Sequence, residues 1–157
     1  MSIFYTLLDI SKNQFTVNDM LDVGKVDKNR CTALVVDDDE DTVNLFVEFL
    51  EICNVTVIGT AFDGKQAEKV YQELVPDIIF SDVMMPEYDG FYALEHIKKI
   101  NPIAIMVMIT GDVRSDTIKK LEDLGADAII YKPFDMQKVV ATVNELLAKK
   151  LNPISSN

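Results

Sequence analysis

The stretch IIFSDVMMPEYDG, residues 78–90, indicates how the whole chain folds. Residues 78–81 are typical of a buried strand, and this run ends at a single carboxylate, Asp82, before the turn pair Asp89-Gly90. A carboxylate at the end of a buried strand is held on a rigid element and is exposed in a fixed direction. We therefore interpret Asp82 as a reactive group, a nucleophile that accepts a phosphoryl group.

The composition limits the classes of protein to consider. The chain has 157 residues, 48% of them hydrophobic, which is enough for one full domain with a short extension. Its net charge of -11 argues against binding to nucleic acid phosphates, and its lysines occur at most in pairs. No apolar run reaches the roughly 18 residues that a membrane helix needs, and the start does not resemble a secretion signal. We expect a cytoplasmic protein that contacts neither membrane nor nucleic acid.

From Cys31 onward, a strand-like run followed by a helical pattern occurs five times. The expected strands are residues 33–36, 55–61, 78–81, 104–110 and 128–131. Continuous apolar strands that alternate with helices predict a parallel sheet covered on both faces. We expect an α/β domain over residues 31–150. An extension over residues 1–30, partly ordered or with a short helix, would precede it, and a flexible tail over residues 151–157 would follow. Cys31 and Cys53 are expected to be buried or idle reduced thiols rather than a disulfide.

Polar side chains follow four of the five expected strands, at the end where an open α/β sheet binds its ligands. In chain order they are Asp37, Asp38 and Asp39, then Asp82, then Thr110, and finally Lys132. Carboxylates that crowd together need a cation between them, and an oxygen-only ligand set favours Mg²⁺. A carboxylate nucleophile forms an acyl phosphate, whose oxygens a lysine and a hydroxyl can bind. Together these residues predict a phosphorylation site.

With these residues identified, the chain resembles the receiver domains of two-component response regulators, of the stand-alone type similar to chemotaxis regulators. The resemblance rests on four motifs in the order of the family, LVVDDD, IIFSDVMMPEYDG, MVMITG and IIYKPF, and it extends over roughly residues 32–147. It implies a flavodoxin-like, doubly wound (βα)5 fold with a parallel sheet in the strand order 2-1-3-4-5.

The resemblance also implies a role for each matched residue of the metal site. Asp82 corresponds to the phosphoacceptor and to one ligand of Mg²⁺. Asp37 and Asp38 correspond to the acidic pair that holds the ion, and the main-chain carbonyl of Met84 corresponds to a further ligand.

The same resemblance implies the signalling chemistry. A sensor histidine kinase or a histidine phosphotransfer protein would pass a phosphoryl group to Asp82. The protein would catalyse only its own phosphorylation and dephosphorylation. Thr110 corresponds to the switch hydroxyl and Lys132 to the lysine of the site, with a cis bond expected between Lys132 and Pro133. An output protein of unknown identity would then bind the altered surface, and a homodimer is one of the expected forms.

One position departs from the family pattern. The family usually has Tyr or Phe three residues before the lysine, where its rotamer couples to the threonine, and this chain has Ile129. Tyr131 is not an obvious substitute for the missing ring. This departure leaves open a receiver-like scaffold that binds a partner without being phosphorylated.

Two further patterns compete for the acids after the first strand. Asp37, Asp39, Asp41 and Glu48 have the spacing of a calcium-binding EF-hand loop. That loop, however, requires Gly where this chain has Thr42, and a helix where it has an apolar strand. Asp37-x-Asp39 also fits the nucleophile motif of haloacid-dehalogenase-type phosphatases, although Asp41 stands where that motif has Thr or Val. The chain is also short for such an enzyme.

Overall fold

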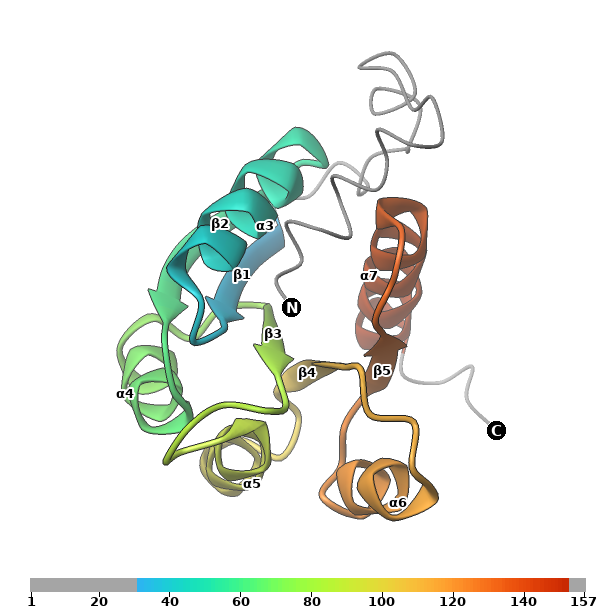
Figure 1. Cartoon of the computed structure of the whole chain (residues 1–157). Coiled ribbons are helices and arrows are strands. Elements are labelled where there is room, and N and C mark those ends of the chain that lie inside the picture. Colours follow the sequence, from blue (N-terminus) through green and yellow to red (C-terminus); the bar gives the residue numbers. More distant parts are fainter. Residues whose placement is uncertain (1–30, 153–157) are drawn as a thin grey trace.

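The computed structural model describes residues 31–152, in which strands and helices alternate (Figure 1). The elements are β1 (Cys31–Val36), α3 (Glu40–Ile52), β2 (Val55–Ala61), α4 (Gly64–Leu74), β3 (Ile78–Asp82), α5 (Gly90–Ile100), β4 (Ile105–Thr110), α6 (Ser115–Asp123), β5 (Ala128–Tyr131) and α7 (Met136–Leu151). The predicted extension over residues 1–30 lies outside the described residues, as do residues 153–157 of the predicted tail. Residue 151 of that tail is the last residue of α7.

The five strands form one parallel sheet in the order β2-β1-β3-β4-β5, which confirms the predicted fold class and strand order. Strand boundaries differ from the prediction by one or two residues. β1 begins at Cys31, because this residue already pairs with Val55. β3 includes Asp82, which pairs with Ile109 of β4. Asp82 is therefore held by the sheet itself, and the loop begins one residue later than expected.

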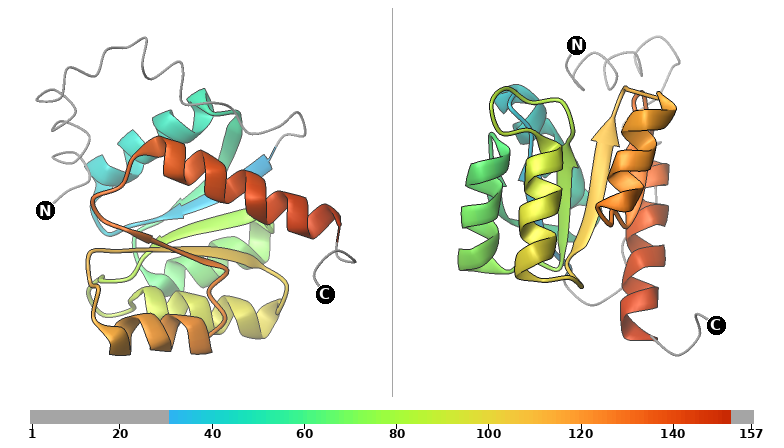
Figure 2. Two further views of the ribbon diagram at one scale, coloured as in Figure 1. Left: turned by 90° about the vertical axis from the view of Figure 1, so that its right-hand side faces the viewer. Right: turned by 90° about the horizontal axis from the view of Figure 1, so that it is seen from below.

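The helices cover the sheet in two layers, so the fold is doubly wound. α3 and α7 lie on one face, and α4, α5 and α6 lie on the other (Figures 1 and 2). Successive residues of β3 point to opposite faces. Ile78 and Phe80 belong to the core beneath α3 and α7, whereas Ile79 belongs to the core beneath the other three helices. Phe80 also meets Phe46 of α3 edge to face, with ring centroids 5.2 Å apart.

The turn after β3 brings the start of α5 against the backbone of Asp82. The N–H of Gly90 donates a hydrogen bond to the carbonyl of Val83 at 2.9 Å. A Cβ atom on Gly90 would lie 2.2 Å from the carbonyl oxygen of Asp82, so only glycine permits this approach. Asp89 caps the helix by accepting a hydrogen bond from the N–H of Tyr92. The turn pair Asp89-Gly90 thus closes the loop that carries the candidate nucleophile.

Two compositional expectations can be compared with the described residues. Cys31 and Cys53 are both buried in the core beneath α3 and α7, and neither forms a disulfide within residues 31–152. Over that same range, the structure contains no helix long and apolar enough to cross a bilayer.

Candidate functional site

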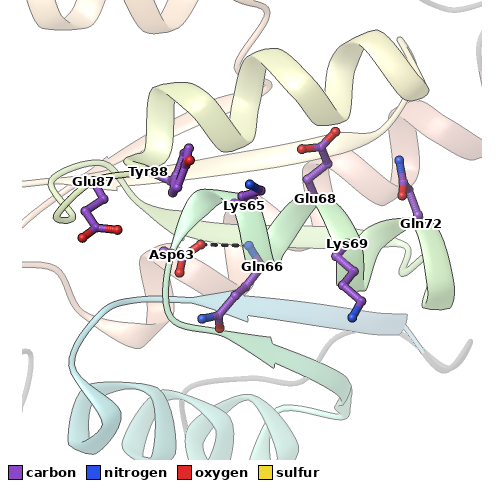
Figure 3. Close-up of a pocket in the computed structure, with 8 residues that line it drawn as sticks. All are labelled: Asp63, Lys65, Gln66, Glu68, Lys69, Gln72, Glu87 and Tyr88. Carbon is purple, nitrogen blue, oxygen red and sulfur yellow. Dashed lines mark hydrogen bonds between the residues drawn. The ribbon is translucent and has the colours of Figure 1, made fainter.

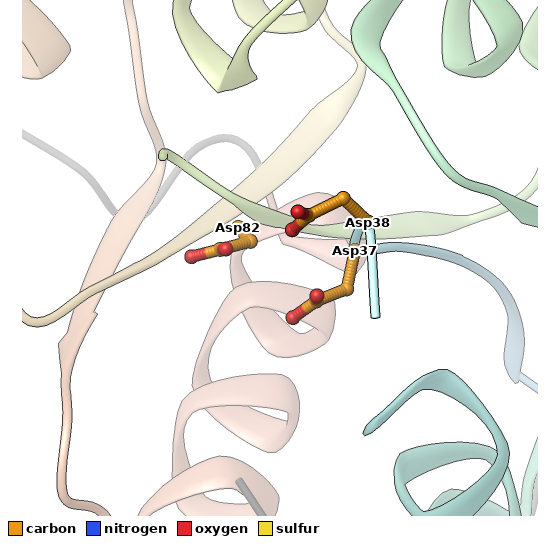
Figure 4. Close-up of side chains that lie close together, drawn as sticks. All are labelled: Asp37, Asp38 and Asp82. Carbon is orange, nitrogen blue, oxygen red and sulfur yellow. The ribbon is translucent and has the colours of Figure 1, made fainter. Parts of the chain in front are cut away.

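Three carboxylates predicted from separate motifs meet at one edge of the sheet. Asp37 and Asp38 follow β1, and Asp82 ends β3, which lies beside β1 in the sheet. One carboxylate oxygen of each lies within 4.8 Å of the other two (Figure 4). Asp37 and Asp82 are buried, with 7% and 8% of their surface exposed, whereas Asp38 is exposed. The cluster is therefore a partly buried acidic site with one side open to solvent.

The electrostatics of Asp37 show that this arrangement suits a cation. Burial, the main cause, acts with the negative charges of Asp82 and Asp38 to raise the pKa of Asp37 to about 7, against the lowering effects of a hydrogen bond from the N–H of Asp39 and of the charge on Lys132. A bound cation would remove this repulsion. The cluster offers only carboxylate oxygens as ligands, which are the donors that a hard ion such as Mg²⁺ prefers. The residues that are present therefore fit a divalent metal ion.

Asp82 is held through one of its two oxygens. Oδ1 accepts hydrogen bonds from the N–H of Val83 at 3.0 Å and from Nζ of Lys132 at 3.1 Å. Oδ2 accepts no hydrogen bond from residues 31–152. Burial raises the pKa of Asp82, and Lys132 and the Val83 N–H reduce this effect without cancelling it. The carboxylate is thus fixed in position, with one oxygen available for chemistry.

Thr110 contributes a buried hydroxyl. It is the last residue of β4, and its side chain has no exposed surface. Its Oγ1 accepts a hydrogen bond from the N–H of Asp112 at 3.0 Å and donates none within the described part of the chain. A hydroxyl carries one donor as well as its acceptor sites, and a buried donor without a partner is unfavourable. The hydroxyl proton of Thr110 is therefore available to a ligand that accepts a hydrogen bond.

Lys132 and Met84 lie where the sequence predicts. Lys132 follows β5, its N–H donates to the carbonyl of Thr110 at 2.8 Å, and the predicted cis bond to Pro133 is present. Met84 lies in the loop after β3, with 62% of its surface exposed. This exposure places its side chain away from the core, and the role of its carbonyl as a metal ligand stays a prediction.

The structure shows what surrounds Ile129, the residue that replaces the aromatic side chain usual in the family. Ile129 is half-buried and packs against the core beneath α4, α5 and α6. Tyr131 pairs in register with Thr110, which places the two residues side by side on the sheet, and 41% of its surface is exposed. An aromatic ring is therefore absent at position 129 and exposed two residues later.

The sequence reasoning missed a polar network in the loop between β4 and α6. The carboxylate of Asp112 accepts hydrogen bonds from the N–H and the guanidinium of Arg114 and from the hydroxyl of Thr117. The hydrogen bonds from Arg114 hold the pKa of Asp112 well below its usual range, so the group stays ionised. An Asp two residues before an Arg at a helix start is a turn-forming pattern that could have signalled it.

A separate groove lies between α4 and the loop after β3, and it shares no residue with the acidic cluster. Its volume is about 410 Å³. The residues that line it are Asp63, Lys65, Gln66, Glu68, Lys69, Gln72, Glu87 and Tyr88 (Figure 3). Both signs of charge occur along it, and Asp63 is used to cap α4 through the N–H of Gln66. The groove therefore shows no preference for one class of ligand.

Comparison with known proteins agrees with the geometry of the site. A family model for the response regulator receiver domain matches residues 33–144. The chain is 35% identical over 115 residues to protein CcdB from Bacillus subtilis, an alignment that covers 73% of this chain and 96% of that protein. It is 34% identical over 115 residues to the chemotaxis protein CheY from Halobacterium salinarum, covering 73% and 95% of the two chains. It also spans 53% of the length of a longer curated relative.

A solved structure shares the fold over a similar range. The complex of CheX with CheY, BeF3 and magnesium from Borrelia burgdorferi matches with a TM-score of 0.71 and 29% identity, over 74% of this chain and 89% of that chain. The family model covers most of the residues that the structure describes, and two of the curated relatives, CcdB and CheY, are matched over nearly their whole length. The chain therefore belongs to the response regulator receiver domain family of two-component signalling proteins.

Proposed function

We propose that Asp82 accepts a phosphoryl group from a phosphohistidine on a sensor histidine kinase or a histidine phosphotransfer protein. One observation carries this proposal. Asp82 is held by Lys132 through Oδ1 while Oδ2 stays without a hydrogen bond from the described residues, next to two further carboxylates. Asp82 is also buried, and polar atoms of buried side chains usually have a hydrogen-bond partner. Here the unused oxygen is available to a substrate.

The transfer is a displacement at phosphorus. Oδ2 of Asp82 attacks the phosphorus atom, the new P–O bond forms, and the bond between phosphorus and the imidazole nitrogen breaks. The bonding electron pair leaves with the imidazole, which becomes neutral or takes a proton from water. In the later hydrolysis, water attacks the same phosphorus, the P–O bond to Asp82 breaks, and inorganic phosphate and the free carboxylate are regenerated.

Mg²⁺ would be held by the carboxylates of Asp37, Asp38 and Asp82 and by the main-chain carbonyl of Met84. When bound, the ion supplies positive charge that offsets the charge of the phosphoryl oxygens. Two features of the chain support this assignment, the oxygen-only ligand set and the raised pKa of Asp37. The similar CheY from Borrelia burgdorferi, whose structure contains magnesium and BeF3, supports it as well.

Thr110 and Lys132 would bind the phosphoryl oxygens once they are on Asp82. The Thr110 hydroxyl has a proton to donate, and Lys132 can move its ammonium group from the carboxylate to the phosphoryl group. These shifts would change the face formed by α6, β5 and α7, near Lys119, Lys120, Ile129 and Tyr131. An output protein or a second copy of the chain would bind there, without nucleic acid or membrane. The cytoplasmic location stays a prediction.

The test is the intact mass of the protein after incubation with acetyl phosphate and Mg²⁺. We expect one phosphate adduct on the wild type, none on Asp82→Asn, and none on the wild type in the presence of a chelator. Asp41→Asn, a change of an exposed acid near the site, should still form the adduct. A folded wild type that binds Mg²⁺ without forming an adduct would contradict the proposal and favour a scaffold that acts without phosphorylation.

A further inference from the structure

We propose that Asp112 and Arg114 are positioning residues that form a latch between Thr110 and the first turn of α6. The latch is defined as Asp112, Arg114 and Thr117. It would transmit the phosphorylation state of Asp82 to α6, so the inference rests on the proposed function. It adds the residues that couple the site to a particular helix.

The latch joins the site to α6 through one carboxylate. The N–H of Asp112 donates to the Thr110 hydroxyl at 3.0 Å, so a displacement of that hydroxyl either moves the backbone of Asp112 or breaks this hydrogen bond. Its Oδ2 accepts hydrogen bonds at 2.7 Å from Nη2 of Arg114 and at 2.7 Å from the hydroxyl of Thr117. Its Oδ1 accepts hydrogen bonds at 3.0 Å from the N–H and from Nε of Arg114. A single side chain thus contacts both the loop and the helix.

The latch also replaces the usual helix cap. The N-cap residue of α6 is Arg114, and it makes no side-chain cap hydrogen bond. The ionised carboxylate of Asp112 lies before the first turn, where negative charge favours the helix dipole. The start of α6 therefore depends on Asp112, a residue that lies outside the helix and next to Thr110 in the loop.

α6 is weakly attached to the rest of the fold. Leu121 is the one buried residue among its nine, whereas α7 buries six residues and α3 buries five. The exposed residue Lys120 contacts the neighbouring helix, with its ammonium group 4.1 Å from the centre of the Phe91 ring of α5. A helix with so few buried contacts can be displaced at small cost in free energy. α6 is therefore the element that a change in the latch would move most easily.

The alternative route through β5 lacks its usual aromatic side chain. Ile129 is branched at Cβ and half-buried, so its rotamers are restricted and it has no ring that could move between two positions. Coupling through the latch does not need such a ring, because it follows the hydrogen bond from Asp112 to Thr110. The latch therefore supplies a route to α6 that this chain possesses and that Ile129 does not provide.

The latch is also suited to being released. The side chain of Arg114 is 78% exposed, and that of Asp112 is 15% exposed. An ion pair with one exposed partner contributes little stability in isolation. Several hydrogen bonds to one carboxylate still define a single arrangement of the loop. Such a contact favours one conformation without making the other inaccessible.

The experiment compares amide hydrogen exchange of α6 in the full chain, with and without beryllium fluoride and Mg²⁺ as a phosphoryl mimic. Fluorine NMR measures separately whether the mimic occupies the site. The variants are Arg114→Gln and Thr117→Val, which remove latch contacts at exposed or half-buried positions. Asp123→Asn, at the exposed far end of α6, is the matched control. Wild type should show a change in α6 exchange of about fivefold or more on binding of the mimic.

In both latch variants, we expect full occupancy and a change in α6 exchange that falls below about twofold, while the control behaves like the wild type. If the latch serves only as a cap, exchange will be faster by the same factor in both states. The difference between the states will then persist, and this result overturns the inference. Loss of the difference in the control, or its absence in the wild type at full occupancy, overturns it too. Absence of the mimic from the wild-type site would instead overturn the proposed function, and the inference with it.

Discussion

Asp37→Asn should stabilise the metal-free protein above neutral pH, although it removes a residue of the proposed metal site. In the folded chain, burial and the neighbouring carboxylates raise the pKa of Asp37 from 3.8 to about 7. An acid whose pKa is raised on folding contributes stability that is fully present below its unfolded pKa and is lost as the pH rises through its folded pKa. The wild type therefore carries this penalty in full above about pH 7.

The size of the penalty follows from the two pKa values. The rise from 3.8 to about 7 corresponds to at most about 4 kcal/mol, and access of water to the open side of the site reduces this to about 2–4 kcal/mol. Asn has nearly the same shape, and its carbonyl oxygen can still accept the hydrogen bond from the N–H of Asp39. The melting temperature of the variant should exceed that of the wild type by about 5–12 °C at pH 8.

The assay is urea unfolding followed by circular dichroism between pH 4 and pH 8, first in EDTA and then with Mg²⁺. The advantage of the variant in EDTA should grow between about pH 4 and pH 7 and stay constant above. Mg²⁺ should stabilise the wild type by more than it stabilises the variant, because the variant has lost one anionic ligand. A variant in EDTA at pH 8 that is no more stable than the wild type would refute the electrostatic reasoning.

Two further substitutions test how the sheet holds the site. Asp77→Asn should lower the free energy of unfolding, measured by urea titration, by about 1 kcal/mol. One oxygen of Asp77 accepts hydrogen bonds from both the N–H and the hydroxyl of Thr32, and Nζ of Lys150 lies 3.4 Å from the other oxygen. The pKa of Asp77 is lowered on folding, because these contacts outweigh the effect of its burial. The difference in stability between wild type and variant should therefore disappear as the pH falls below the normal pKa range of an Asp. A difference that persists at low pH would contradict this reasoning. Gly90→Ala should destabilise the fold by about 1–3 kcal/mol and reduce the phosphate adduct at Asp82, since the new methyl group would collide with the Asp82 carbonyl; a normal adduct yield would refute this.

Much of the fold and site could be predicted because both depend on regular local rules. Apolar strands alternating with helices dictate a parallel sheet covered on both faces, and the ends of parallel strands meet at one edge. For this reason Asp37, Asp38 and Asp82, from two motifs far apart in the sequence, could be placed together before the structure was known. Cys31 and Cys53 were expected to be reduced thiols on the different ground of cysteine usage, and both lie in the core as free cysteines.

The features that were missed depend on contacts that no pattern of apolar residues specifies. Asp82 belongs to β3 because Ile109 pairs with it across the sheet, which a prediction of one strand at a time does not include. The hydrogen bonds of Asp112 form only when the loop adopts one turn. The position of Tyr131 beside Thr110 depends on the register between β4 and β5. In each case the missing information is a pairing between segments.

The distribution of burial explains why a signal from this site would reach α6 before the other helices. Asp37 and Asp82 are attached to β1 and β3, strands in the middle of the sheet that are buried by helices on both faces. The side chains around these residues are closely packed, so they resist displacement when the hydrogen bonding at Asp37 or Asp82 changes. Thr110 ends β4 and is bonded to Asp112, and beyond Asp112 the chain enters a helix with a single buried residue. By the proposed mechanism, the same change in hydrogen bonding would therefore produce the largest movement where the packing is weakest, along the path from Thr110 through the latch to α6.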